Sequence, residues 1–123
     1  MIGGAVSSNM STSSDNFQSL WGADSNATEA NVEATMPLAG TLSDFYVRVS
    51  QAPGTGNSWT FTVRKNGADE AALQCPISGS SAVTCSDTAG TVSYAVGDRI
   101  AIRSDPDSGP NAAIMHWTAQ YTP

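Results

Sequence analysis

The sequence predicts an all-β domain, a jelly-roll-type antiparallel β-sandwich of about 8–10 short strands. The chain has 123 residues, a length that suits one hydrophobic core. Hydrophobic residues make up 40% of it but charged residues only 13%, about half of the usual ~25%. From about residue 39 onward, apolar and polar side chains alternate, and turn sequences recur every ~8–12 residues. This combination is typical of short strands joined by tight turns.

The N-terminal part of the chain is less regular. Residues 1–14 are small, polar and glycine-bearing, so we expect an N-terminal arm there and the sandwich domain over residues 15–123. The segment from Phe17 to Trp21 has the composition of a strand.

Residues 27–36 admit two interpretations. Asn26 and Glu29 have the spacing of a capping box, which would open a short helix. The β-branched Val32 and the following Pro37 disfavour a helix, so we favour an extended strand.

Strict alternation predicts two strands in the middle of the chain. In residues 41–49, the core face carries Phe45, Val47 and Val49, and the outer face carries Asp44, Tyr46 and Arg48. After a turn over residues 50–57, the second strand directs Trp59, Phe61 and Val63 inward.

The Asn66-Gly67 dipeptide then predicts a β-hairpin. A two-residue loop would set Val63 opposite Glu70, an apolar residue against a charged one. A three-residue loop that includes Ala68 matches apolar to apolar residues, so we predict that register. The expected pairs are Lys65–Asp69, Val63–Ala71, Phe61–Leu73 and Trp59–Cys75.

The two cysteines are predicted to face one another. If the chain turns back about Ser80, Cys75 lies directly opposite Cys85, within the Cα separation that a disulfide accepts. Such a bridge would stabilise the domain by roughly 2–3 kcal/mol. The alternative is a pair of reduced, buried cysteines in a reducing cytoplasm. No histidine is near them in the sequence, which argues against a zinc site.

The C-terminal part of the chain has the same period of two. Val92, Tyr94 and Val96 alternate with small residues, and Gly97-Asp98 is a tight turn. In the strand that follows, Ile100 and Ile102 are expected to face inward and Arg99 and Arg103 outward. A loop is expected over Asp105–Pro110. The last strand is expected from about Ala112 to Tyr121, with one face made of Met115, Trp117, Ala119 and Tyr121.

The charge of the chain argues against two classes of partner. Eleven acidic residues against five basic ones give a net charge of −6, and the basic residues are scattered. Nucleic acids and anionic membranes both select clustered cations, so we expect neither as a partner. The N-terminus has neither the positive charge nor the apolar run of a signal peptide, which predicts synthesis in the cytoplasm.

No pattern for catalysis, cofactor binding or metal binding is evident. His116 is the single histidine, and nothing marks a nucleophile or an orienting carboxylate for it. Asp105 and Asp107 resemble the first half of a calcium loop, but His116 stands where the loop needs its bidentate acid. A looser site would add Asp87, but an ordinary turn is the simpler interpretation. Glu29 and Glu33 are expected to be solvated acids.

The aromatic residues divide into core and surface groups. Trp59 and Trp117 fall on predicted core faces, which leaves Trp21, Tyr46 and Tyr94 for external contacts. Tyr46 is flanked by Asp44 and Arg48 on the outer face, and an exposed aromatic of this kind is typical of an interface. The parity of the last strand also puts His116 on a polar or interfacial face. We therefore predict four interface residues: Trp21, Tyr46, Arg48 and His116.

About half of the sequence, residues 37–105, resembles small phage-associated proteins. The resemblance rests on Pro37–Ser50, Ala52–Gly67, the segment from Cys75 through Ser78-Gly79 to Asp87, and Val96–Ile100. These proteins are similar to the complement C1q and tumour-necrosis-factor jelly-roll class, which usually forms trimers.

The resemblance implies a non-enzymatic virion structural protein. Such a protein would be made in the host bacterial cytoplasm, form a homotrimer, bind the major capsid protein and decorate the capsid surface as a cement protein. It would need no cofactor. The alternative within the same resemblance is a carbohydrate- or receptor-binding module of a tail fibre or spike.

Overall fold

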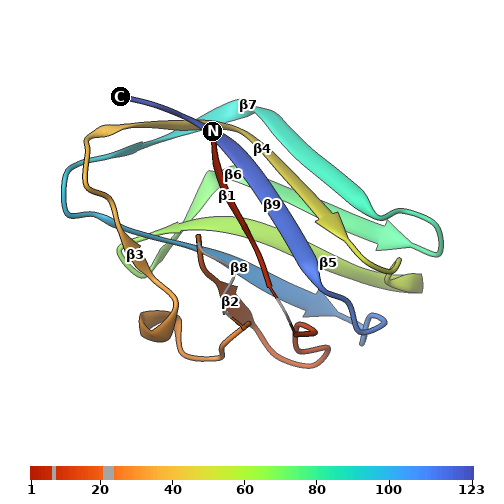
Figure 1. Ribbon diagram of the computed structural model, residues 1–123. Helices are drawn as coiled ribbons and strands as arrows, with labels where there is room; N and C mark the ends of the chain where they lie inside the picture. The colour runs from red at the N-terminus through yellow and green to blue at the C-terminus, as the bar shows by residue number, and fades with distance from the viewer. Residues whose placement is uncertain (7, 21–23) are drawn as a thin grey trace.

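The protein is a sandwich of two antiparallel sheets, which confirms the predicted fold class (Figure 1). The computed structural model describes residues 1–123 except residue 7 and residues 21–23. In the described residues, one sheet has the strand order β1-β9-β4-β7, and the other has the order β2-β8-β5-β6, with β3 also paired to β8. The elements are β1 Ile2–Ala5, β2 Asn16–Gln18, the 3₁₀ turn η1 Glu29–Asn31, β3 Ala34–Thr35, β4 Gly40–Val49, β5 Gly54–Lys65, β6 Ala68–Gly79, β7 Thr84–Tyr94, β8 Arg99–Asp107 and β9 Met115–Thr122.

The first half of the chain pairs with the second half in reverse order. The nested antiparallel pairs are β5 with β6, β4 with β7, β2 with β8 and β1 with β9. Successive pairs alternate between the two sheets, so the chain is one long ribbon rolled over a shared core. This order is consistent with the jelly-roll topology that the sequence predicts.

The core lies between the sheets and follows the predicted parity. Trp59, Phe61 and Val63 of β5 have no exposed surface, and they face Phe45 and Val47 of β4 across the sandwich. Val49, Ile100, Ile102, Met115, Trp117 and Ala119 are also buried, whereas Tyr121, predicted on the same face as Trp117, is only partly buried against the core. Period-two alternation was therefore sufficient to identify the core of the central strands.

A β-bulge in β4 adds one core residue that strict alternation misses. The register with β7 shifts between Ser43 and Phe45, and Asp44 adopts a positive φ of 51°. Because the bulge takes up one residue, Leu42 and Phe45 both point inward although they are three positions apart.

The prediction of an N-terminal arm over residues 1–14 is wrong. β1 pairs with β9, with Gly4 opposite Trp117, so it is an edge strand of the first sheet. Val6 and Met10 are buried in the core. The segment lacks alternation because the backbone approaches closely: a Cβ on Gly4 would overlap the carbonyl oxygen of Ser19. The sandwich therefore begins at Ile2 rather than near residue 15.

Residues 17–36 contain less strand than predicted. β2 covers Asn16–Gln18, so only the start of the predicted strand is confirmed, and residues 21–23 lie outside the described residues. Both interpretations of residues 27–36 are partly correct, because a 3₁₀ turn precedes the two-residue strand β3.

The hairpin register is corrected by the structure. The loop has two residues, Asn66 and Gly67, and Val63 lies opposite Glu70, the pairing that the prediction rejected. The register then shifts between Val63 and Thr62, which places Gln74 opposite Thr62 and Cys75 opposite Phe61. The extra residues in β6 form a bulge that restores the inward direction of the later side chains. Matching apolar residues across the turn therefore predicted the wrong loop length, because the bulge, rather than the loop, brings the apolar residues of β6 back to the core face.

The cysteines form a disulfide that joins the two sheets. The Cα atoms of Cys75 and Cys85 are 5.8 Å apart. The predicted geometry is wrong, because β6 and β7 are not hydrogen-bonded neighbours: β6 pairs with β5 and β7 pairs with β4. The bond crosses the open edge of the sandwich between these strands.

The predicted loop over Asp105–Pro110 starts too early. β8 continues to Asp107, and Trp59 of β5 lies opposite Pro106. A proline is tolerated here because β2 pairs with β8 only at residues 102–104, so at Pro106 the described residues give β8 the character of an edge strand.

Candidate functional site

The outer face of the first sheet brings together three of the four predicted interface residues. Arg48 of β4 lies opposite His116 of β9 and opposite Thr84 of β7. One step along the same face, Tyr46 lies between Thr118 and Ser86. We call these six residues the Tyr46 face: Tyr46, Arg48, Thr84, Ser86, His116 and Thr118.

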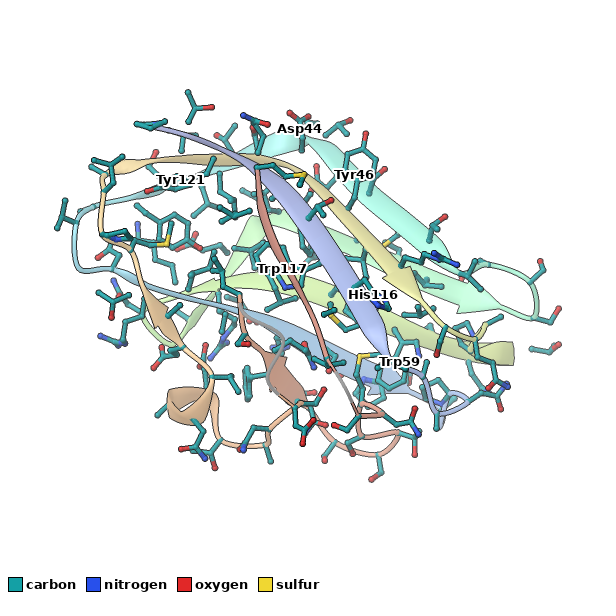
Figure 2. All side chains as sticks on the ribbon, viewed as in Figure 1. Asp44, Tyr46, Trp59, His116, Trp117 and Tyr121 are labelled. Carbon is teal, nitrogen blue, oxygen red and sulfur yellow. A yellow bond between two sulfur atoms is a disulfide. The ribbon has the colours of Figure 1, made fainter. Side chains whose placement is uncertain are left out.

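The parity of the central strands produces this arrangement. Trp117 and Val47 point into the core, so their neighbours on β9 and β4 must point outward. Figure 2 labels Tyr46 on β4 and His116 on β9, next to the inward Trp117. Tyr46 is 51% exposed, a large fraction for an aromatic side chain in the middle of a sheet.

The Tyr46 face lines a shallow hollow of about 480 Å³. Its wall consists of the six residues of the face together with Val47, Cys85 and Trp117. The rim carries hydroxyl groups from Thr84, Ser86 and Thr118, which donate and accept hydrogen bonds. The disulfide lies beneath one side of the hollow through Cys85, and it ties this side to the second sheet.

Arg48 differs from the other cations of the chain. Among the lysine and arginine side chains of the described residues, it is the one with neither an ion pair nor a hydrogen bond to a protein group. Arg64 binds Glu29 and Asp69, while Lys65 donates to the Ser93 carbonyl oxygen at 2.9 Å. Arg99 and Arg103 also pair with carboxylates. The exposed guanidinium of Arg48 is therefore available to a partner.

The outer face of the second sheet is closed by its own ion pairs. Arg64 donates to both carboxylate oxygens of Glu29, at 3.0 and 2.8 Å, and to Asp69 at 2.7 Å. The hydrogen bond to Glu29 is the largest effect that raises the pKa of Arg64 above its ordinary value. The guanidinium also lies 5.2 Å from the ring centroid of Phe17. Glu29 is thus a structural ligand rather than the solvated acid that we expected.

Arg103 anchors a second group of carboxylates on this sheet. It contacts Asp69 at 2.6 Å, Asp105 at 3.2 Å and Asp15 at 3.7 Å. Desolvation, and next the negative charge of Asp15, raise the pKa of Asp105 above its ordinary value despite Arg103. Glu33 likewise pairs with Arg99 at 3.2 Å, so it is not free in solvent either.

The structure does not bring together the three aspartates considered for calcium. Asp105 pairs with Arg103 on β8, whereas Asp87 on β7 accepts the backbone N–H groups of Gln74, Ala89 and Gly90. Desolvation raises the pKa of Asp87, but these three donors outweigh it and hold the pKa below its ordinary value. Over the residues with described positions, no cluster of three or more His, Cys, Asp or Glu side chains has the arrangement of a metal site.

The remaining predicted surface residues have different fates. Tyr94, a candidate for external contacts, is 3% exposed and donates its hydroxyl to the Arg64 carbonyl oxygen at 3.0 Å, so that prediction is wrong. Burial raises the pKa of Tyr94 well above its ordinary value. Trp21 lies outside the described residues. The interface roles of Tyr46, Arg48 and His116 stay predictions.

Sequence reasoning missed the hydroxyl rim of the Tyr46 face. Thr84, Ser86 and Thr118 are unremarkable in the sequence, and only the register of β4 with β7 and β9 places them around Tyr46. The signal available in the sequence was their parity. Thr84 and Ser86 on β7, and His116 and Thr118 on β9, are two positions apart and therefore point to the same face of the sheet.

Comparisons with known proteins give no match: neither a protein-family model nor a curated protein matches this sequence. In the parts of the chain that the structure describes, no helix has the length and apolar character needed to cross a membrane.

Proposed function

We propose that this protein is a non-enzymatic virion structural protein that decorates a phage capsid. In this proposal the chain forms a homotrimer on the capsid surface and docks on the major capsid protein through the Tyr46 face. The resemblance of residues 37–105 to phage-associated jelly-roll proteins motivates the class of protein. The fold supports it, because a sandwich closed by an inter-sheet disulfide is a rigid body on which a docking face is held in place.

The observation that carries the docking role is the exposed Tyr46 beside the unpaired Arg48. Tyrosine and arginine are enriched among the residues that contribute most to protein–protein binding. A tyrosine supplies a large contact area with little loss of side-chain entropy, and an arginine can form two parallel hydrogen bonds with one acceptor. The three copies in one trimer would combine modest individual contacts into a stable attachment.

Co-sedimentation with capsids tests this proposal. Purified protein should pellet with capsids that lack it, and Tyr46→Ala should raise the Kd for capsids at least about tenfold, as expected for an interface residue that contributes more than ~1.4 kcal/mol. Val96→Ala is the matched control, because Val96 is 67% exposed on the loop between β7 and β8, away from this face. Equal binding of the Tyr46→Ala variant and the unchanged protein would exclude docking through this face.

Light scattering tests the oligomeric state separately. A homotrimer of the 12.7 kDa chain has a mass of about 38 kDa. A monomer that does not bind capsids would contradict the decoration role.

A carbohydrate- or receptor-binding module is the second candidate function. The observation that favours it is the hydroxyl-rimmed hollow, whose volume of about 480 Å³ falls within the range of small-ligand sites. A glycan array separates the two candidates, because a capsid decoration protein should bind no sugar. Binding to a defined glycan that Tyr46→Ala abolishes would replace the first proposal with this one.

A further inference from the structure

We propose that the Tyr46 face is a carboxylate-binding site, at which Arg48 and His116 hold an acidic side chain of the docked protein partner. This inference rests on the proposed docking function and names the chemistry of the partner. In it, the partner presents an aspartate or glutamate to Arg48, while an adjacent part of its surface packs on the ring of Tyr46.

The charge distribution is the first argument for an acidic partner. The chain carries a net charge of −6. None of the described residues that line the hollow is an aspartate or a glutamate, and two of them, Arg48 and His116, have basic side chains. Asp44 is the nearest acid along β4, and it sits at the bulge, where Ser43 donates its hydroxyl to it at 3.5 Å. A carboxylate is the group that complements this local charge.

The register of β4 and β9 is the second argument. Arg48 and His116 are directly opposite one another, so their Cβ atoms are about 4.5–5.5 Å apart. The N–H groups of both side chains can therefore donate to one carboxylate placed between them. The hydroxyl groups of Thr84 and Thr118 flank the pair and can donate to the same anion.

The exposure of the face favours a protein carboxylate over a small acid. The Tyr46 face is the open surface of a sheet, and half of the Tyr46 side chain is in solvent. A small ligand is usually enclosed on most of its surface, whereas a protein partner covers an open face and excludes water around the buried contact. Only such cover would raise the strength of an arginine–carboxylate hydrogen bond above that of an exposed ion pair.

A titration followed by amide NMR tests the proposal. The probes are an acetylated, amidated hexaglutamate peptide and the matched hexaglutamine peptide. Hexaglutamate should shift the amide resonances of β4, β7 and β9 around Tyr46, and hexaglutamine should not. Arg48→Gln should weaken hexaglutamate binding about two- to fivefold, because the flexible peptide leaves the ion pair exposed to solvent. Arg99→Gln is the matched control, because Arg99 is also exposed but lies on β8 of the other sheet and already pairs with Glu33.

The outcomes separate this inference from the capsid proposal. Equal shifts by both peptides, or unchanged binding by an Arg48→Gln variant with a native spectrum, would overturn the carboxylate site. Binding of oligogalacturonate but not of hexaglutamate would overturn the protein partner and leave an acidic sugar as the ligand. Hexaglutamate binding at the face without co-sedimentation on capsids would support the site while refuting the capsid role. Capsid binding that Arg48→Gln leaves intact would refute the site alone.

Discussion

Reduction of the Cys75–Cys85 disulfide should destabilise the fold because the bond restricts the conformational freedom of the unfolded chain. The cysteines are separated by 10 positions, and on the chain-entropy model a closed loop of this length contributes about 2.7 kcal/mol to the free energy of unfolding. For a chain of 123 residues, that loss corresponds to a decrease in Tm of about 10 °C. The assay is urea unfolding, followed by tryptophan fluorescence, of the oxidised and the reduced protein.

The reduced protein is a better comparison than a substituted one. Cys75 is 2% exposed, so alanine at this position would add the cost of a cavity to the loss of the bond. The Cys75→Ala/Cys85→Ala variant is instead the control for the reductant, whose presence should leave the unfolding curve of this variant unchanged. A decrease of less than about 1 kcal/mol on reduction of the unchanged protein would refute the argument that the bond constrains the unfolded chain.

Three further perturbations have definite expected outcomes. Arg64→Ala should lower the free energy of unfolding by about 2–3 kcal/mol, because it leaves the mostly buried carboxylate of Glu29 without its ion pair, whereas Asp69 keeps its pair with Arg103. Arg99→Ala breaks a more exposed ion pair and should lower the free energy of unfolding by less than ~1 kcal/mol in the same urea titration. Gly90→Ala should lower the free energy of unfolding by more than about 3 kcal/mol, because the new Cβ would overlap a backbone oxygen of the β6 bulge. Gly79→Ala is the comparison: it adds only the strain of a positive φ and should lower the free energy of unfolding by about 1–2 kcal/mol. The depressed pKa of Asp87 contributes stability above its unfolded-state pKa of about 3.9, and this stability is lost as the pH falls through the lower folded-state value. Unfolding of the Asp87→Asn variant should therefore depend less on pH in the acid range, and an unchanged slope would contradict the role of the three N–H donors.

The sequence was most informative where one face of a strand is fully buried. After the bulge of β4 and in β9, burial alternates with every residue, and the core-facing side chains of β5 and β8 keep the same period of two, so Trp59, Phe61, Ile102 and Trp117 could be assigned to the core from parity. The same parity placed Tyr46 on the outside.

The errors arose where the backbone, rather than burial, decides the structure. β1 contains Gly3, which lies against the backbone of β9, and Gly4, which lies against the backbone of residues 19 and 20, so it has no apolar alternation to detect. The β6 hairpin contains a bulge that no turn residue announces, and apolar matching therefore gave the wrong loop length. The partnership of Arg64 with Glu29 spans 35 positions and depends on a turn that packs over β5.

The candidate site required the same long-range information. Parity predicted that Tyr46, Arg48 and His116 each point outward, but not that Arg48 and His116 are adjacent, because that depends on the register of β4 with β9. It also could not predict that Arg48 lacks an ion pair, because ion pairs in this fold often join distant segments. The pairs of Arg99 with Glu33 and of Arg103 with Asp15 and Asp69 span at least 30 positions, whereas the pair of Arg103 with Asp105 is local.

The two outer faces of the sandwich differ in how their cations are paired, and this difference bears on the docking face that we propose. On the second sheet, the turn η1 covers part of the face, and Arg64 and Arg103 are neutralised by carboxylates of the same chain. On the first sheet, the described residues place no turn over the Tyr46 face, and Arg48 has no ion pair there. A partner that docked on the second sheet would have to break existing ion pairs, whereas one that docks on the Tyr46 face adds contacts without this cost. The first sheet is therefore the face on which a docked protein gains most per contact.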